Sequence, residues 1–90
     1  MKRVHVLITG RVQGVSFRYY TTQTAKKMGL VGWTMNLADG RVEAVAEGDE
    51  ETLKQFVLWC KQGPSTARVD DTYVRWMEAT GEFRTFKTTH

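Results

Sequence analysis

The apolar residues of this chain change their spacing repeatedly along its 90 residues, and this alternation constrains the fold more than any other feature. In residues 3–9 the β-branched apolar side chains stand at every second position, which predicts a strand with one buried face: Val4, Val6 and Ile8. From Phe17 the spacing becomes helical, and one stripe of side chains is expected to face the core: Phe17, Thr21, Thr24, Ala25 and Met28. Gly29 predicts where this helix ends.

The same alternation recurs in the rest of the chain. Residues 30–37 and 41–47 predict two strands, and Asp39-Gly40 between them is typical of a tight hairpin, so these strands should pair antiparallel. Acidic residues at 49–51 favour the start of a second helix, which Gly63-Pro64 ends. Residues 67–77 predict a fourth strand, and residues 83–87 predict either a final strand or an extension of the sheet.

The order strand–helix–strand–strand–helix–strand predicts the fold class. It is the βαββαβ arrangement of an α+β, ferredoxin-like two-layer sandwich, in which two helices cover one face of an antiparallel sheet. The length of 90 residues predicts a single domain over residues 1–90. This fold carries many unrelated functions, so function has to be argued from particular residues.

Composition excludes several classes of protein. Hydrophobic residues make up 41% and charged residues 26% of the chain, which is typical of a globular domain. No apolar run approaches the roughly 20 residues of a membrane span, and the N-terminus lacks a signal-peptide core, so we expect a cytoplasmic protein without a membrane partner. The net charge of +3 comes from scattered basic residues, which permits an anionic ligand but does not indicate a nucleic-acid arm.

The stretch from Gly10 to Arg18, Gly-Arg-Val-Gln-Gly-Val-Ser-Phe-Arg, is the most informative part of the sequence. A glycine-bearing loop before a helix can point several backbone N–H groups at one anion, and the guanidinium of Arg18 in the first turn can fold over it. The alternative is a tight turn beside a solvated arginine, and the spacing alone leaves both open. A nucleotide P-loop is excluded because Gly-Lys-Ser/Thr is missing.

Metal and cysteine chemistry have little support in the sequence. A phosphatase of the Cys-x5-Arg type would need its nucleophile where this chain has Val12. Cys60 lies on the apolar stripe of the second helix with Leu53, Phe56 and Val57, so we expect it in the core. His5 and the terminal His90 have no neighbouring ligand cluster. We therefore expect no metal site.

Two segments resemble the signature motifs of the acylphosphatases. The first is Gly10-Arg11-Val12-Gln13-Gly14-Val15-x-Phe17-Arg18, and the second is Gly32-Trp33-x-x-Asn36 followed by Asp39-Gly40-Arg41-Val42-Glu43. The resemblance continues through Glu47-Gly48 to Gly63-Pro64. It implies the same ferredoxin-like fold and an enzyme that hydrolyses the carboxyl–phosphate bond of small acyl phosphates, releasing inorganic phosphate. It implies neither a metal nor an organic cofactor.

The resemblance also assigns roles to residues. Arg18 and the backbone amides of six consecutive residues would bind the phosphoryl group: Gln13, Gly14, Val15, Ser16, Phe17 and Arg18. Asn36 would orient the attacking water, with no covalent intermediate. An amide side chain is suited to this because it offers both donors and an acceptor. Without the resemblance, Asn36 would be an ordinary residue before a turn.

Two alternatives and two departures accompany this interpretation. RNA-recognition domains share the strand–helix order, but residues 3–9 carry no Phe, Tyr or Trp for stacking, so no nucleic-acid partner is expected. A regulatory module could keep the phosphate site without turnover. Where relatives often carry Val and a basic residue, this chain has Thr34-Met35, and its tail from Lys87 to His90 lacks their aromatic end. A monomer is expected for so small a domain.

Overall fold

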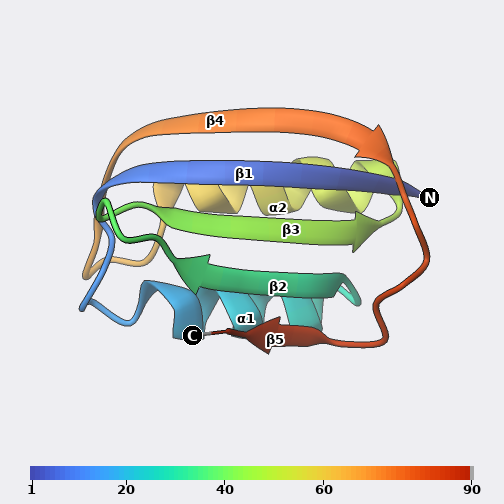
Figure 1. Ribbon diagram of the computed structural model, residues 1–90, viewed down its shortest axis with the longest axis horizontal. Helices are drawn as coiled ribbons and strands as arrows, with labels where there is room; N and C mark the ends of the chain where they lie inside the picture. The colour runs from blue at the N-terminus through green and yellow to red at the C-terminus, as the bar shows by residue number, and fades with distance from the viewer. Residues whose placement is uncertain (90) are drawn as a thin grey trace.

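The computed structural model describes residues 1–89 and contains two layers, a five-stranded sheet and two helices (Figure 1). The elements follow in the order β1 (Lys2–Arg11), α1 (Phe17–Lys27), β2 (Val31–Asn36), β3 (Val42–Gly48), α2 (Glu50–Gln62), β4 (Arg68–Glu78) and β5 (Phe86–Thr88). The sequence predicted the first six elements in this order and left residues 83–87 open as a final strand or an extension of the sheet; residues 86–88 form the strand β5. The ends of the elements differ from the predicted ends by a few residues at most.

The strand order across the sheet is β4-β1-β3-β2-β5. The pairs β1–β3, β1–β4 and β2–β3 are antiparallel, as predicted, and the hairpin at Asp39-Gly40 joins β2 to β3. The pair β2–β5 is parallel, so the expectation of a wholly antiparallel sheet is wrong at this edge. The reason is the connection from β4 to β5, which crosses from one edge of the sheet to the other and enters β5 in the direction of β2 (Figure 1).

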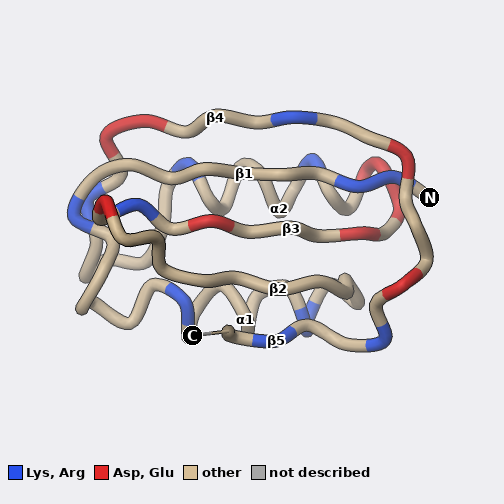
Figure 2. The backbone as a smooth tube through the Cα atoms, in the orientation of Figure 1, with Lys and Arg blue, Asp and Glu red and all other residues tan. Residues whose placement is uncertain are grey.

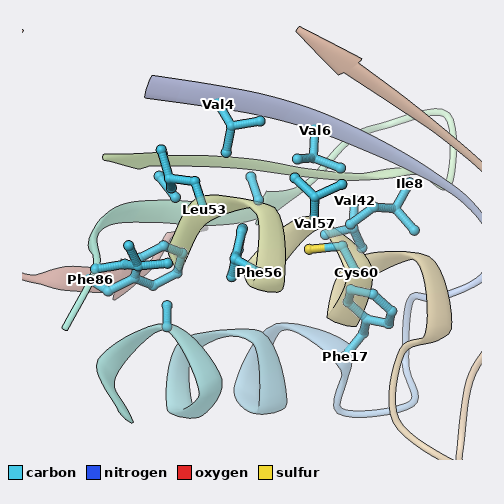
Figure 3. Close-up of a cluster of buried hydrophobic side chains, with 14 of the residues drawn as sticks. Val4, Val6, Ile8, Phe17, Val42, Leu53, Phe56, Val57, Cys60 and Phe86 are labelled. Carbon is cyan, nitrogen blue, oxygen red and sulfur yellow. The ribbon is translucent and has the colours of Figure 1, made fainter. Parts of the chain in front are cut away.

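The core lies between the sheet and the helices (Figure 3). β1 contributes Val4, Val6 and Ile8, all fully buried, as their alternation predicted. The four residues predicted for the apolar stripe of α2 are also buried: Leu53, Phe56, Val57 and Cys60. In α1 the buried residue is Thr22 instead of Thr24, because its hydroxyl meets that of Thr88 on β5 at 2.7 Å. Thr22 is therefore covered by β5.

The charged residues are dispersed over both layers (Figure 2). This agrees with the scattered pattern of basic residues in the sequence. In the part of the chain that the structure describes, no helix is both long and apolar enough to cross a membrane.

Candidate active site

The loop between β1 and α1 has an unusual backbone. Gly14 and Ser16 adopt left-handed conformations, with φ angles of 73° and 62°, and Ser16 is the residue that precedes the helix. Left-handed residues interspersed in a turn direct successive N–H groups into a concave anion-binding surface. Ser16 gives no side-chain cap to α1, so its strained conformation serves the shape of the loop instead of helix capping.

The start of this loop is fixed by a close approach of two strands. The pairing of β1 with β4 shifts between Thr9 and Gly10, where a β-bulge forms. A Cβ atom on Gly10 would lie 2.1 Å from the carbonyl oxygen of Arg68, so only glycine fits. The bulge bends β1 as it leaves the sheet and enters the loop.

Asn36 reaches the same region from the end of β2. It pairs with Val42, which in turn pairs with Ile8, and Ile8 points toward the helices. Residues opposite one another in a sheet share a face, so the side chain of Asn36 also lies on the helix side. Its Oδ1 atom is buried, and none of the described residues donates a hydrogen bond to it. A buried acceptor without a donor costs about 1–3 kcal/mol, so this atom has the character of a ligand-binding group.

A cavity of about 260 Å³ brings the loop and Asn36 together. Its lining comes from the loop, the first turn of α1 and the ends of β2 and β5: Val12, Gly14, Ser16, Phe17, Arg18, Tyr19, Asn36 and Thr88. Five of the residues predicted from the sequence are among these. The other two, Gln13 and Val15, belong to the loop but do not line the cavity. Among residues 1–89, no carboxylate or imidazole side chain lines the cavity.

Arg18 is half-buried in the first turn of α1, and the chain's tail holds its guanidinium. Nη1 of Arg18 donates a hydrogen bond to the carbonyl oxygen of Thr89 at 2.8 Å. Thr89 is itself fixed, because its N–H donates to the carbonyl of Thr34 at 2.8 Å. The tail therefore orients the arginine at the wall of the cavity. No pattern in the sequence predicted this contact.

Comparison with known proteins decides the family. The family model described as Acylphosphatase matches residues 4–88. The chain belongs to the acylphosphatase family. It is 55% identical over 86 residues to an acylphosphatase of Methylococcus capsulatus, and this match covers 96% of the chain and 94% of the relative. It is 52% identical to an acylphosphatase of Roseiflexus sp., with 96% of the chain and 92% of the relative covered.

Solved structures lead to the same family. The crystal structure of the Bacillus subtilis acylphosphatase superposes with a TM-score of 0.96 at 38% sequence identity, and the match covers 100% of both chains. The acylphosphatase fold expected from the sequence is therefore confirmed.

The two residues of the first departure from the acylphosphatase motifs, Thr34 and Met35, lie on opposite faces of β2. Thr34 is fully buried on the helix side, where its hydroxyl donates to the carbonyl of Glu43 at 3.0 Å and its own carbonyl accepts from Thr89. Met35 alternates to the face without helices. A different residue at position 35 would therefore point away from the cavity, whereas Thr34 supports the tail that holds Arg18.

The side chain of Gln13 has a role that sequence reasoning missed. Only its backbone was expected to act, but its Nε2 atom donates to the carbonyls of Leu37 and Arg41 at 2.7 and 2.9 Å. No local sequence pattern predicts a contact between residues so far apart in the sequence.

Cys60 is fully buried in the core, as predicted, and it is not among the residues that line the cavity. Burial raises the pKa of its thiol far above the usual value, so the thiol stays protonated. Across residues 1–89, no group of three or more His, Cys, Asp or Glu residues could hold a metal ion.

Proposed function

We propose that the cavity hydrolyses the carboxyl–phosphate bond of small acyl phosphates, giving a carboxylate and inorganic phosphate. Membership of the acylphosphatase family supports this reaction class. In the proposal, the backbone N–H groups of residues 13–18 and the guanidinium of Arg18 bind the phosphoryl oxygens. The concave loop with two left-handed residues supports the first part, and the position of Arg18 on the cavity wall supports the second.

Asn36 orients the attacking water in this proposal. The observation that carries it is that Asn36 lines the cavity and that its buried Oδ1 atom accepts no hydrogen bond from a described residue. A water molecule that donates to this oxygen would have its lone pair directed toward the phosphorus. The water thereby satisfies the orphaned acceptor and is held for in-line attack.

The chemistry needs few further groups. Phosphoryl transfer passes through a loose transition state, so catalysis consists mainly of positioning and charge stabilisation. The carboxylate of an acyl phosphate is a weakly basic leaving group and needs no strong general acid. A cavity lined without carboxylate or imidazole among the described residues suits that requirement. We propose direct attack by water, with no covalent intermediate, no metal ion and no organic cofactor.

We further propose that residues 1–90 act as one monomeric domain in the cytoplasm, without a nucleic-acid partner. The core shared by both layers supports the single domain, and the dispersed charge supports the lack of a nucleic-acid partner (Figures 2 and 3).

Hydrolysis of benzoyl phosphate in excess chelator tests the proposed function. The wild-type protein should turn over the substrate with chelator present, and Arg18→Ala should reduce turnover by about 10³-fold or more, the magnitude typical of an arginine that stabilises phosphoryl charge. Arg75→Ala on β4 is the matched control, because it removes an exposed guanidinium remote from the cavity lining. An inactive wild-type protein would contradict the proposed hydrolysis and would show that the cavity binds its ligand without turnover.

A further inference from the structure

The two halves of the site are carried by different connections of the chain. The loop of residues 12–16, the phosphate loop, leads from β1 into α1, whereas Asn36 stands at the end of β2, just before the turn of residues 37–41. In-line attack needs both halves at a fixed separation, since a misplacement of 1 Å can reduce the rate of a reaction about 10²-fold. A contact between the loop and the turn would therefore matter for catalysis.

Gln13 makes that contact. Its Nε2 atom carries two hydrogens, and it donates to the carbonyl oxygens of Leu37, at 2.7 Å, and Arg41, at 2.9 Å. These carbonyls are the first and last of the turn. Both also accept hydrogen bonds inside the turn, from the N–H of Gly40 and the N–H of Leu37. Each carbonyl oxygen has two lone pairs, so one can accept the hydrogen bond within the turn and the other can accept from Gln13.

The half-buried position of this side chain makes the link stronger than a surface contact. Leu37 directly follows Asn36, so fixing the Leu37 carbonyl also fixes the peptide that carries Asn36. The donor is the planar side-chain amide of Gln13, and both acceptors are main-chain carbonyls. The link therefore has little rotational freedom.

Resting on the proposed function, we infer that Gln13 is a positioning residue, whose side-chain amide sets the separation between the phosphate loop and the water held by Asn36. It does not touch the substrate with its side chain, which lies outside the cavity lining. It acts through Asn36.

The variant Gln13→Met tests this, because it removes both donors while keeping an unbranched side chain of similar length. With benzoyl phosphate, we expect kcat to fall about 10- to 100-fold. The dissociation constant of inorganic phosphate, measured as competitive inhibition, should change less than about threefold, because the loop keeps its own backbone conformation. A role confined to folding would not separate kcat from phosphate affinity in this way.

The decisive arm is a double-mutant cycle with Asn36→Ala. If Gln13 acts through Asn36, then Gln13→Met in the Asn36→Ala background should lower kcat by less than about twofold. The matched control is Thr66→Val. The Thr66 hydroxyl anchors the same loop, donating to the carbonyl of Val15 at 2.8 Å, but it does not reach the turn. This control should keep kcat within about threefold of the wild-type value.

Three results would overturn the inference: an unchanged kcat in Gln13→Met, a parallel loss of phosphate affinity, or an equal fall in both backgrounds. Should Gln13→Met lack a cooperative thermal transition, Gln13→Leu takes its place in the same cycle. Inactive wild-type protein would instead count against the proposed function itself. An active wild type with an impaired Asn36→Ala and a normal Gln13→Met would contradict the positioning role alone.

Discussion

At the end of the sheet where β1 begins, the buried carboxylate of Glu47 accepts hydrogen bonds from the side chain of Arg3, the N–H and hydroxyl of Thr80 and the N–H of Gly81. At the opposite end, the buried Oδ1 of Asn36 accepts none from the described residues. The two groups are similarly removed from water, so burial alone does not distinguish them. The difference lies in the hydrogen-bond donors: the protein supplies them to Glu47, whereas no described residue supplies one to Asn36.

This comparison separates structure from chemistry. Glu47 is 2% exposed, and three of its four hydrogen bonds come from Thr80 and Gly81 in the crossover from β4 to β5, while the fourth comes from Arg3 on β1. We call the cluster of Glu47, Arg3, Thr80 and Gly81 the clamp, because it attaches the crossover to the sheet. The cavity end keeps an orphaned acceptor and a left-handed Ser16, both of which cost stability. Such costs concentrate where a ligand or a reaction uses the strained and unsatisfied groups.

The largest expected effect is at the cavity end and concerns phosphate binding. Inorganic phosphate should raise the melting temperature of the wild-type protein, because a ligand that binds only the folded state stabilises it. Arg18→Ala should abolish that rise, whereas Arg75→Ala should keep it. Thermal unfolding across a phosphate titration measures this. An Arg18→Ala protein with the full wild-type rise would show that the anion site lies elsewhere.

A substitution of Glu47 in the clamp should lower stability and leave catalysis unchanged. Glu47→Gln removes the charge and places an amide against donors, so the free energy of unfolding should fall by about 3 kcal/mol, within the range for a broken buried ion pair. The kcat of the folded variant should match the wild type. Urea unfolding and benzoyl phosphate hydrolysis check both expectations.

Glu78→Gln is the matched control for this substitution. It breaks an exposed ion pair with Lys2 and should leave the unfolding midpoint unchanged. Equal destabilisation by both variants would contradict the clamp.

The clamp also predicts the direction of acid sensitivity. Desolvation raises the pKa of Glu47, but the hydrogen bonds from Thr80, Arg3 and Gly81 outweigh it, so the pKa lies below its usual value of 4.5. A lowered folded-state pKa contributes stability that is complete above the unfolded value and is lost as the pH falls through the folded value. Unfolding free energies should therefore decline below about pH 4.5, and less steeply in Glu47→Gln. Equal slopes would contradict this.

The smallest effect should come from the strained loop. Ser16 has a φ angle of 62°, which costs an L-residue about 1–2 kcal/mol, while glycine loses about 0.5–1 kcal/mol to its greater freedom in the unfolded chain. Ser16→Gly should therefore raise the free energy of unfolding by about 0.5–1 kcal/mol. A lower value would mean that the Ser16 side chain stabilises the loop.

What the sequence predicted depends on how local each signal is. The alternation of Val4, Val6 and Ile8 and the Asp39-Gly40 turn act through neighbours, and both led to the right elements and pairing. The glycine-bearing loop and Arg18 could be found as a candidate anion site for the same reason. Their placement on one cavity with Asn36 follows from the pairing of β2 with β3.

The long-range contacts could not be predicted. The parallel addition of β5 depends on a crossover whose direction no residue of the strand encodes. The hydrogen bond from Arg18 to Thr89 depends on that same crossover. The hydrogen bonds from Gln13 to the turn depend on the sheet being formed first. In each case the partners are brought together by the fold, so their residue types alone carry no signal.

The most direct test of the account is to measure turnover and phosphate binding in Asn36→Ala. The account predicts that kcat for benzoyl phosphate falls by about 10²- to 10³-fold, the usual effect of removing one well-placed polar group from an active site. It also predicts that inorganic phosphate still raises the melting temperature as much as in the wild type. A near-normal kcat, or a loss of phosphate binding in step with kcat, would contradict the water-orienting role of Asn36.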